Sequence, residues 1–183
     1  EVNNTGVAGS FRAVNYFQNI GTVTEPMFGE EENDSPNSNG IIPLESNSVK
    51  SNSPYFYQTE NELLLFTGTD AGEIRVWNNY NQDTQLFTLK NDRLGNILIG
   101  RNSVPAVFDI DNDGFLDIVS STSDPRGSLS LFRNTGDGKF VDLTKGSGLD
   151  DQLGGLNCIA ADYDNDGDAD ILVLRGAWMN SMG

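Results

Sequence analysis

Short apolar stretches alternate with polar, glycine-rich turns along most of the chain. Four of these stretches, at 104–108, 116–120, 157–161 and 169–174, are five or six residues long and flank turns rich in Asp, Asn and Gly. Stretches of this length beside turn residues are typical of β-strands, because helices need about 10 or more periodic residues. The pattern therefore predicts an all-β fold built from short strands.

A recurring marker groups the strands into repeated units. An aromatic residue stands two positions before an asparagine that opens a turn at Phe17-Gln18-Asn19, Trp77-Asn78-Asn79 and Phe132-Arg133-Asn134, so the asparagines are 60 and 55 residues apart. Two prolines, Pro54 and Pro105, are 51 residues apart. Each unit reads as four strands in about 50 residues, which is close to one blade of a β-propeller.

The units divide the chain into partial and fuller blades. The sequence predicts the late part of a blade over 8–28, a surface loop rich in Glu, Asn, Ser and Pro over 29–53, a blade over 54–92, a blade with an acidic loop over 104–143, and the start of another such blade over 156–178. Propellers close with about 4–8 blades, and repeat units need neighbours to bury their faces. About three blades leave the ring incomplete, so we expect additional blades or another chain to complete it.

Two copies of the pattern D-x-D-x-D-G-x-x-D stand between paired strand candidates. The carboxylates belong to Asp109, Asp111, Asp113 and Asp117 in the first loop and to Asp162, Asp164, Asp166 and Asp170 in the second. Four like charges within nine residues repel one another unless a cation lies between them, and a hard dication prefers many oxygen ligands. Two copies in the same phase of the repeat favour ion binding over solvated acidic turns. The sequence therefore predicts two Ca²⁺ sites.

An EF-hand is the competing interpretation of these loops. That motif needs a bidentate Glu at position 12 and flanking helices, whereas position 12 is Ser120 or Val173 and the flanks read as strands. The position-9 aspartate supplies the late bidentate ligand instead. Ca²⁺ is favoured over Mg²⁺ because a flexible loop with many oxygens suits the larger ion. The 54–92 blade lacks the acidic pattern, and we expect no ion there.

Composition excludes several classes of function. The net charge is −16, from 27 acidic and 11 basic residues, and no cluster of Lys and Arg exists to neutralise phosphates, so nucleic acid is not an expected partner. The chain has no histidine, which excludes Ser-His-Asp and Cys-His catalysis and typical zinc sites within it. The lone Cys158 has apolar neighbours, which predict a buried structural thiol.

No apolar run reaches the ~18–20 residues of a transmembrane helix, and we expect any export signal to lie outside these residues.

Two stretches of the chain, 130–144 and 160–173, resemble the FG-GAP or VCBS repeat family, the calcium-loop blades of integrin α-like β-propellers. They are most similar to the blades of cartilage-acidic-protein-like members. The resemblance is specific over 104–178, and it extends more loosely to 54–92 and 8–28.

The resemblance implies a set of ion ligands and a setting. Besides the carboxylates at positions 1, 3, 5 and 9, the family uses the backbone carbonyl at position 7, which belongs to Phe115 in the first loop and Asp168 in the second. Members are extracellular or otherwise extracytoplasmic, and they serve in adhesion, ligand binding or as scaffolds around a catalytic partner.

These observations favour a calcium-stabilised, extracytoplasmic binding or scaffold module that presents loops to a protein or glycan partner. We expect no catalytic site in this chain, because nearly every clustered acid is already assigned to an ion. Two alternatives stay open. The chain could be the non-catalytic portion of a carbohydrate-active propeller enzyme, or an accessory subunit of a large extracytoplasmic complex.

Overall fold

The computed structural model describes residues 13–17, 21–27, 39–43, 51–81, 86–122, 124 and 126–175, and this part of the chain is all-β, as the sequence predicts. It holds one short 3₁₀ turn, η1 (Leu94–Asn96), besides the strands. The strands are β1 (Ala13–Phe17), β2 (Asn39–Pro43), β3 (Ser51–Gln58), β4 (Leu63–Thr69), β5 (Ile74–Asn81), β6 (Leu86–Asn91), β7 (Ser103–Phe108), β8 (Asp117–Thr122), β9 (Ser130–Asn134), β10 (Phe140–Asp142), β11 (Asn157–Ala161) and β12 (Asp170–Leu174).

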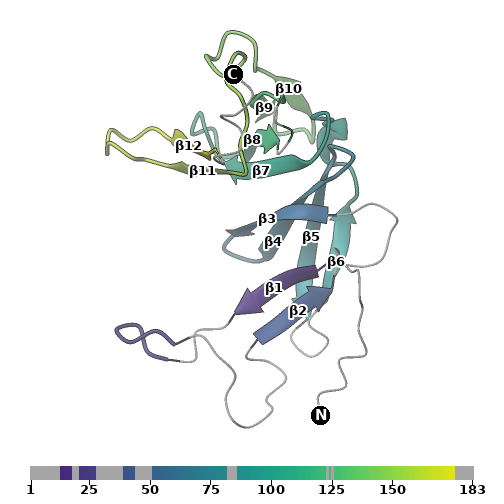
Figure 1. The fold of residues 1–183 in the computed structure, drawn as a ribbon, viewed down its shortest axis with the longest axis vertical. Helices are drawn as coiled ribbons and strands as arrows, with labels where there is room; N and C mark the ends of the chain where they lie inside the picture. Colours follow the sequence, from purple (N-terminus) through teal and green to yellow (C-terminus); the bar gives the residue numbers. More distant parts are fainter. Residues whose placement is uncertain are drawn as a thin grey trace.

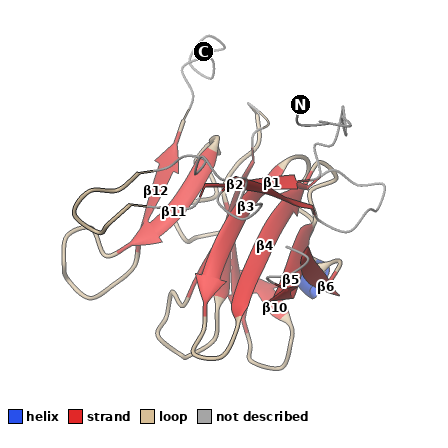
Figure 2. Cartoon of the chain, turned by 90° about the horizontal axis from the view of Figure 1, so that it is seen from below, coloured by secondary structure: helices blue, strands red, loops and turns tan. Residues whose placement is uncertain are grey.

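Two four-stranded antiparallel sheets form the centre of the molecule. Each sheet is a meander in chain order, β3-β4-β5-β6 and β7-β8-β9-β10, and Figure 2 shows β3 to β6 side by side. The pairs β1-β2 and β11-β12 flank them, and the sheets follow one another through the molecule (Figure 1). The first strands of successive sheets lie against one another, because β7 contacts both β3 and β11. Stacked meanders of this kind are propeller-like blades, and within the described residues they do not close into a ring.

The prolines that mark the repeat occupy strands at the edge of their sheets. Pro54 lies in β3 next to a register shift, and Pro105 lies in β7. Proline cannot donate a ladder hydrogen bond, so it is confined to edge strands and bulges. The two prolines are 51 residues apart because each lies in the first strand of its blade.

Alternation along the strands buries both faces of the second sheet. Val107 and Ile118 pack against the first sheet, in a cluster that includes Phe66 and Val76. Their sequence neighbours point the opposite way, because successive side chains of a strand face opposite sides. Ala106, Val119 and Leu131 accordingly pack with Cys158 of β11, and Cys158 is fully buried.

The N-terminal part differs from the sequence-based expectation. We expected 29–53 to be a surface loop, but β2 lies within it and β3 begins before its end. β2 pairs with β1, so the partner of β1 lies outside the predicted 8–28 unit. The physical reason is that a strand can take its hydrogen bonds from a distant partner, and the local hydrophobic pattern does not reveal that partner. Phe28 and residues 29–38 lie outside the described residues.

Cys158 gives a solution test of the packing between the second sheet and β11. Burial raises the pKa of its thiol to about 11, and only the thiolate reacts with disulfide reagents. We expect the native thiol to react with such a reagent at pH 8 at least about a hundredfold more slowly than the thiol of the urea-unfolded chain. Equal rates in the two states would show that β11 does not stay packed on the second sheet.

Candidate metal centres

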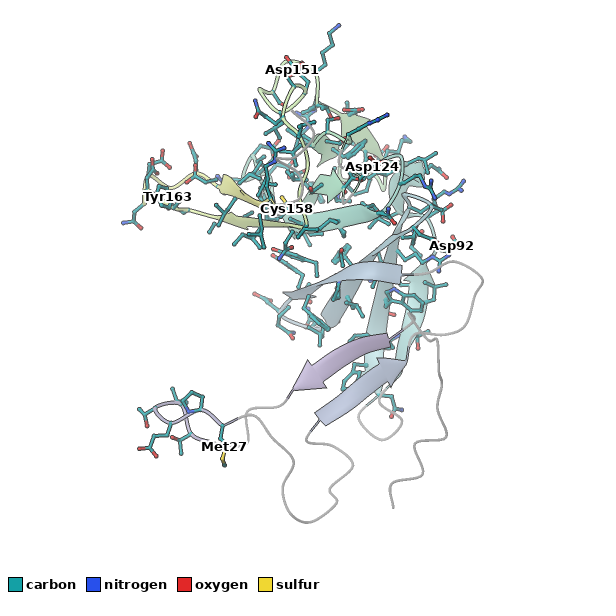
Figure 3. All side chains as sticks on the ribbon, viewed as in Figure 1. Met27, Asp92, Asp124, Asp151, Cys158 and Tyr163 are labelled. Carbon is teal, nitrogen blue, oxygen red and sulfur yellow. The ribbon has the colours of Figure 1, made fainter. Side chains whose placement is uncertain are left out.

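The two acidic loops are the tips of two equivalent hairpins. The first connects β7 to β8, and the second connects β11 to β12, where Tyr163 marks the tip in Figure 3. The strand bounds match the apolar stretches of the sequence to within two residues at either end. Each loop is therefore held at both ends by an antiparallel ladder.

The first aspartate of each loop fastens the middle of the loop through backbone hydrogen bonds. Asp109 accepts from the N–H groups of Asp113 (3.0 Å) and Gly114 (2.8 Å). In the second loop the corresponding bonds run from Asp166 (3.1 Å) and Gly167 (3.1 Å) to Asp162. The same bonds form twice because Asp side chains readily accept from backbone N–H groups a few residues ahead.

Positions 5 and 9 repeat their contacts as well. The position-5 carboxylate accepts from the N–H of position 7, and the position-9 carboxylate accepts from the N–H of position 2. The pairs are Asp113 with Phe115 (2.8 Å) and Asp117 with Ile110 (2.9 Å) in the first loop, and Asp166 with Asp168 (2.9 Å) and Asp170 with Tyr163 (2.9 Å) in the second. The nine-residue pattern thus encodes a specific loop conformation as well as a charge cluster.

Backbone conformation explains the Asn at position 4 and the Gly at position 6. Asn112 and Asn165 have φ of 58° and 65°, in the left-handed region that Asn tolerates better than most residues. Gly114 and Gly167 have φ of 90° and 97°, and a Cβ built on either would meet nothing within 4 Å. The glycines are therefore required by backbone conformation and not by crowding.

Three carboxylates converge in each loop. Asp109, Asp111 and Asp117 each offer an oxygen within 4.8 Å of the others, and so do Asp162, Asp164 and Asp166. A set made only of carboxylate oxygens fits a hard divalent cation and not a soft transition metal. The donor chemistry of both loops therefore suits a metal ion.

The predicted fourth carboxylate lies outside the convergent group in each loop, and it differs between them. It is Asp113 in the first loop and Asp170 in the second, and each still accepts a backbone hydrogen bond inside its loop. The N–H groups of Phe115 and Asp168 belong to the same network. Coordination by their carbonyl oxygens, and by the full predicted ligand sets, stays a prediction.

Asp117 differs from every other loop carboxylate in being fully buried. Besides the bond from Ile110, its carboxylate accepts from the N–H of Asn134 at 2.7 Å. Burial raises the pKa of Asp117, and repulsion from Asp111 and Asp113 adds to the increase, while the two N–H donors oppose it. A bound cation would favour the charged form and reverse this direction.

Sequence reasoning missed the contribution of strand β9 to the first loop. Asn134, recognised only as a turn marker, also donates from its side chain to the carbonyl of Leu116 at 3.1 Å. Arg133 places its Nη1 3.9 Å from the Asp111 carboxylate. The recurring aromatic-x-Asn marker was the available signal, because its asparagine recurs at 19, 79 and 134 with a spacing close to one blade.

The two loops are unequally supported by the rest of the molecule. Ile110 at position 2 of the first loop packs on the cluster around Val119, whereas Tyr163 at the same position of the second is 88% exposed. A Cβ on Gly136 would come 2.7 Å from the Phe115 ring, so this ring covers the turn after β9. All the carboxylates of the second loop are exposed. The first loop is therefore the more rigidly preorganised of the two.

The corresponding turn of the first sheet has different chemistry. Thr59 closes the β3–β4 turn by accepting from the N–H of Glu62 at 2.9 Å. The Glu62 carboxylate accepts from Lys90 (2.7 Å) and Asn78 (3.0 Å), which lowers its pKa. This acid is thus committed to an ion pair at the sheet surface.

Comparison with known proteins identifies the repeated segment. A family model described as an FG-GAP-like repeat matches residues 109–173, from the first aspartate of the first loop into β12. No curated protein and no solved structure matches the chain significantly. In the described residues, no helix is long and apolar enough to cross a membrane.

Proposed function

Because residues 109–173 belong to the FG-GAP-like repeat family, we propose that the chain is a calcium-stabilised, extracytoplasmic binding or scaffold module within a larger β-propeller. FG-GAP-like repeats build propeller modules that often act in binding. The observation that carries the proposal is the repetition of one loop geometry, with the same internal hydrogen bonds and a convergent trio of carboxylates in each copy.

The ion has a structural role in this proposal. Without a cation the carboxylates of each loop repel one another, and in the first loop a buried carboxylate adds a desolvation cost. A bound ion relieves both effects and holds the hairpin tip against its strands. Loops of this kind in extracellular modules bind Ca²⁺ with a Kd of about 10⁻⁴–10⁻³ M, which suits an extracytoplasmic setting.

The proposed module is non-catalytic and works through its surfaces. One such surface is the outer face of the β11–β12 pair, where Ile159, Leu172 and Leu174 are 42%, 66% and 61% exposed. The opposite face of the pair packs on the second sheet through Cys158 and Val173. Repeat units bury such faces against neighbours, so we propose that a further blade or another chain covers this one. The remaining loops are then free to meet a protein or glycan partner.

Calcium titration tests the proposal directly. At 2 mM Ca²⁺ and a Kd of about 10⁻⁴ M, each site adds about 1.8 kcal/mol to the free energy of unfolding. We expect the melting temperature measured by circular dichroism to rise by roughly 7–14 °C for the two sites. Mg²⁺ at the same concentration is expected to produce a smaller rise, because it demands a tighter octahedral geometry.

A double variant, Asp109→Asn with Asp162→Asn, is the control for non-specific salt effects. It keeps the size of both side chains but removes one charged ligand from each loop, and we expect it to lose most of the response to Ca²⁺. A wild-type chain whose melting temperature does not change with Ca²⁺ would contradict the structural role. An equal rise in the double variant would place the effect outside these loops.

A further inference from the structure

A second kind of site lies at the end of the second sheet opposite the first acidic loop. A pocket of about 420 Å³ opens there, between the residues that precede β7 and the connection from β8 to β9. The acidic loop and the pocket are separated by the length of β7, which is six residues or about 20 Å. Asp124, labelled in Figure 3, lies in the connection that lines the pocket.

Two arginines line the pocket with their guanidinium groups uncommitted. In the described part of the chain, neither Arg101 nor Arg126 has an ion pair or a side-chain hydrogen bond. Four other exposed cations do pair with carboxylates, and they are Lys90, Arg93, Arg133 and Lys139. The hydroxyls of Ser128 and Ser130 line the same pocket and are likewise uncommitted among the described residues. The pocket therefore concentrates free donors.

The local charge is positive although the chain is strongly acidic. Asp124 is the one acid among the lining residues, and its carboxylate accepts from the backbone N–H of Arg126 at 3.0 Å. Two cations against one anion leave a net positive pocket. The acidic loop about 20 Å away contributes little, because the Debye length is about 8 Å at physiological ionic strength. The residues that line the pocket therefore favour an anion over a cation.

A second cavity of about 420 Å³, between the two central sheets, lacks this property. It is lined mainly by apolar side chains, and each of its three polar side chains already has a partner. Lys90 binds Glu62, Asn91 accepts from the N–H of Arg93, and Asn134 bonds to the backbone around it. It offers no set of free donors to a ligand. Of these two cavities, the arginine pocket is the one in which a polar ligand would gain contacts.

We propose that the arginine pocket binds an acidic sugar, with its oxyanion between Arg101 and Arg126. The planar fork of a guanidinium matches a carboxylate or sulfate in bidentate fashion. The serine hydroxyls complement sugar hydroxyls, and the 63% exposed Leu98 side chain offers an apolar rim for the ring. This inference deepens the proposed binding role, and it names acidic glycans as the partner class.

The test measures binding of defined oligosaccharides to the full chain in 2 mM Ca²⁺ by titration calorimetry or NMR. A hyaluronan tetrasaccharide carries only carboxylates, a chondroitin sulfate tetrasaccharide adds sulfate, and cellotetraose is neutral. We expect both acidic sugars to bind and the neutral one not to bind. The stronger of the two acidic probes identifies which oxyanion the guanidinium pair prefers.

Two double variants locate the site. Arg101→Gln with Arg126→Gln is expected to weaken binding at least tenfold, while Lys139→Gln with Lys145→Gln removes the same charge elsewhere and is expected to change it less than twofold. Equal loss in both, or no loss in the arginine variant, would overturn the proposal. Binding of inorganic sulfate or an acidic peptide as tight as that of the sugars would also overturn it. The melting temperature in Ca²⁺, recorded on the same samples, tests the calcium role separately from the pocket.

Discussion

Replacing Asp117 with alanine is expected to lower the free energy of unfolding by about 2–4 kcal/mol, because two backbone N–H groups lose their acceptor in a buried setting. Those donors belong to Ile110 and Asn134, and the carboxylate between them has no exposed surface. Urea unfolding in the absence and presence of Ca²⁺ measures the change. The variant is also expected to lose the calcium response of the first loop.

Two further variants separate the hydrogen bonds from the charge. Asp117→Asn keeps one acceptor and removes the charge of a buried carboxyl whose pKa is raised. In calcium-free buffer we therefore expect it to lower the free energy of unfolding less than Asp117→Ala does. It is still expected to weaken the calcium response. Asp170→Ala makes the same change at the same position of the second loop, where the carboxylate is exposed, and is expected to cost less than about 1 kcal/mol. Equal losses for Asp117→Ala and Asp170→Ala would show that burial does not set the difference.

Replacing Gly68 with alanine is expected to lower the free energy of unfolding by about 3 kcal/mol, which is the upper end of the usual destabilisation by overpacking. Gly68 lies in β4 where this strand crosses β7, and a Cβ there would be only 1.8 Å from the carbonyl oxygen of Ser103. The Ser103 hydroxyl joins β7 to β4 by accepting from the N–H of Thr69 (2.9 Å), and it donates to the carbonyl of Glu73 (2.8 Å) in the turn after β4. The two nearest atoms to this Cβ, the carbonyl oxygen and carbon of Ser103, belong to the backbone, so rotation of a side chain cannot relieve the clash.

Gly138→Ala is the matched control for this substitution. Gly138 has φ of 81° and open space around its Cβ position, so only backbone strain of about 1 kcal/mol is expected. Urea unfolding of both variants gives the comparison. We expect the reaction rate of the native Cys158 thiol to be unchanged in both variants, because this thiol packs between the second sheet and β11. A Gly68→Ala chain as stable as wild type would mean that the two central sheets are not in close backbone contact.

The strands around the acidic loops could be predicted because their signals are local. The apolar stretches at 104–108 and 157–161 became β7 and β11 with nearly the same bounds. β2 could not be predicted in this way, because its partner β1 lies 22 residues earlier at the closest pair, Phe17 with Asn39. Hydrophobic periodicity reports which face of a strand is buried, but it carries no information about a distant pairing partner.

The sequence alone accounts for the conformation that both acidic loops share, because each hydrogen bond common to the two copies joins residues within nine positions of each other. The Asp side chains, the left-handed Asn and the Gly act in the same way in each copy. The tertiary structure made the two copies different. β9 follows β8 in the second sheet and brings Arg133 and Asn134 to the first loop, whereas in the described residues the β11–β12 pair has no third strand. Burial depends on strands contributed from elsewhere, so Asp117 is enclosed and Asp170 is exposed although their local sequences are equivalent.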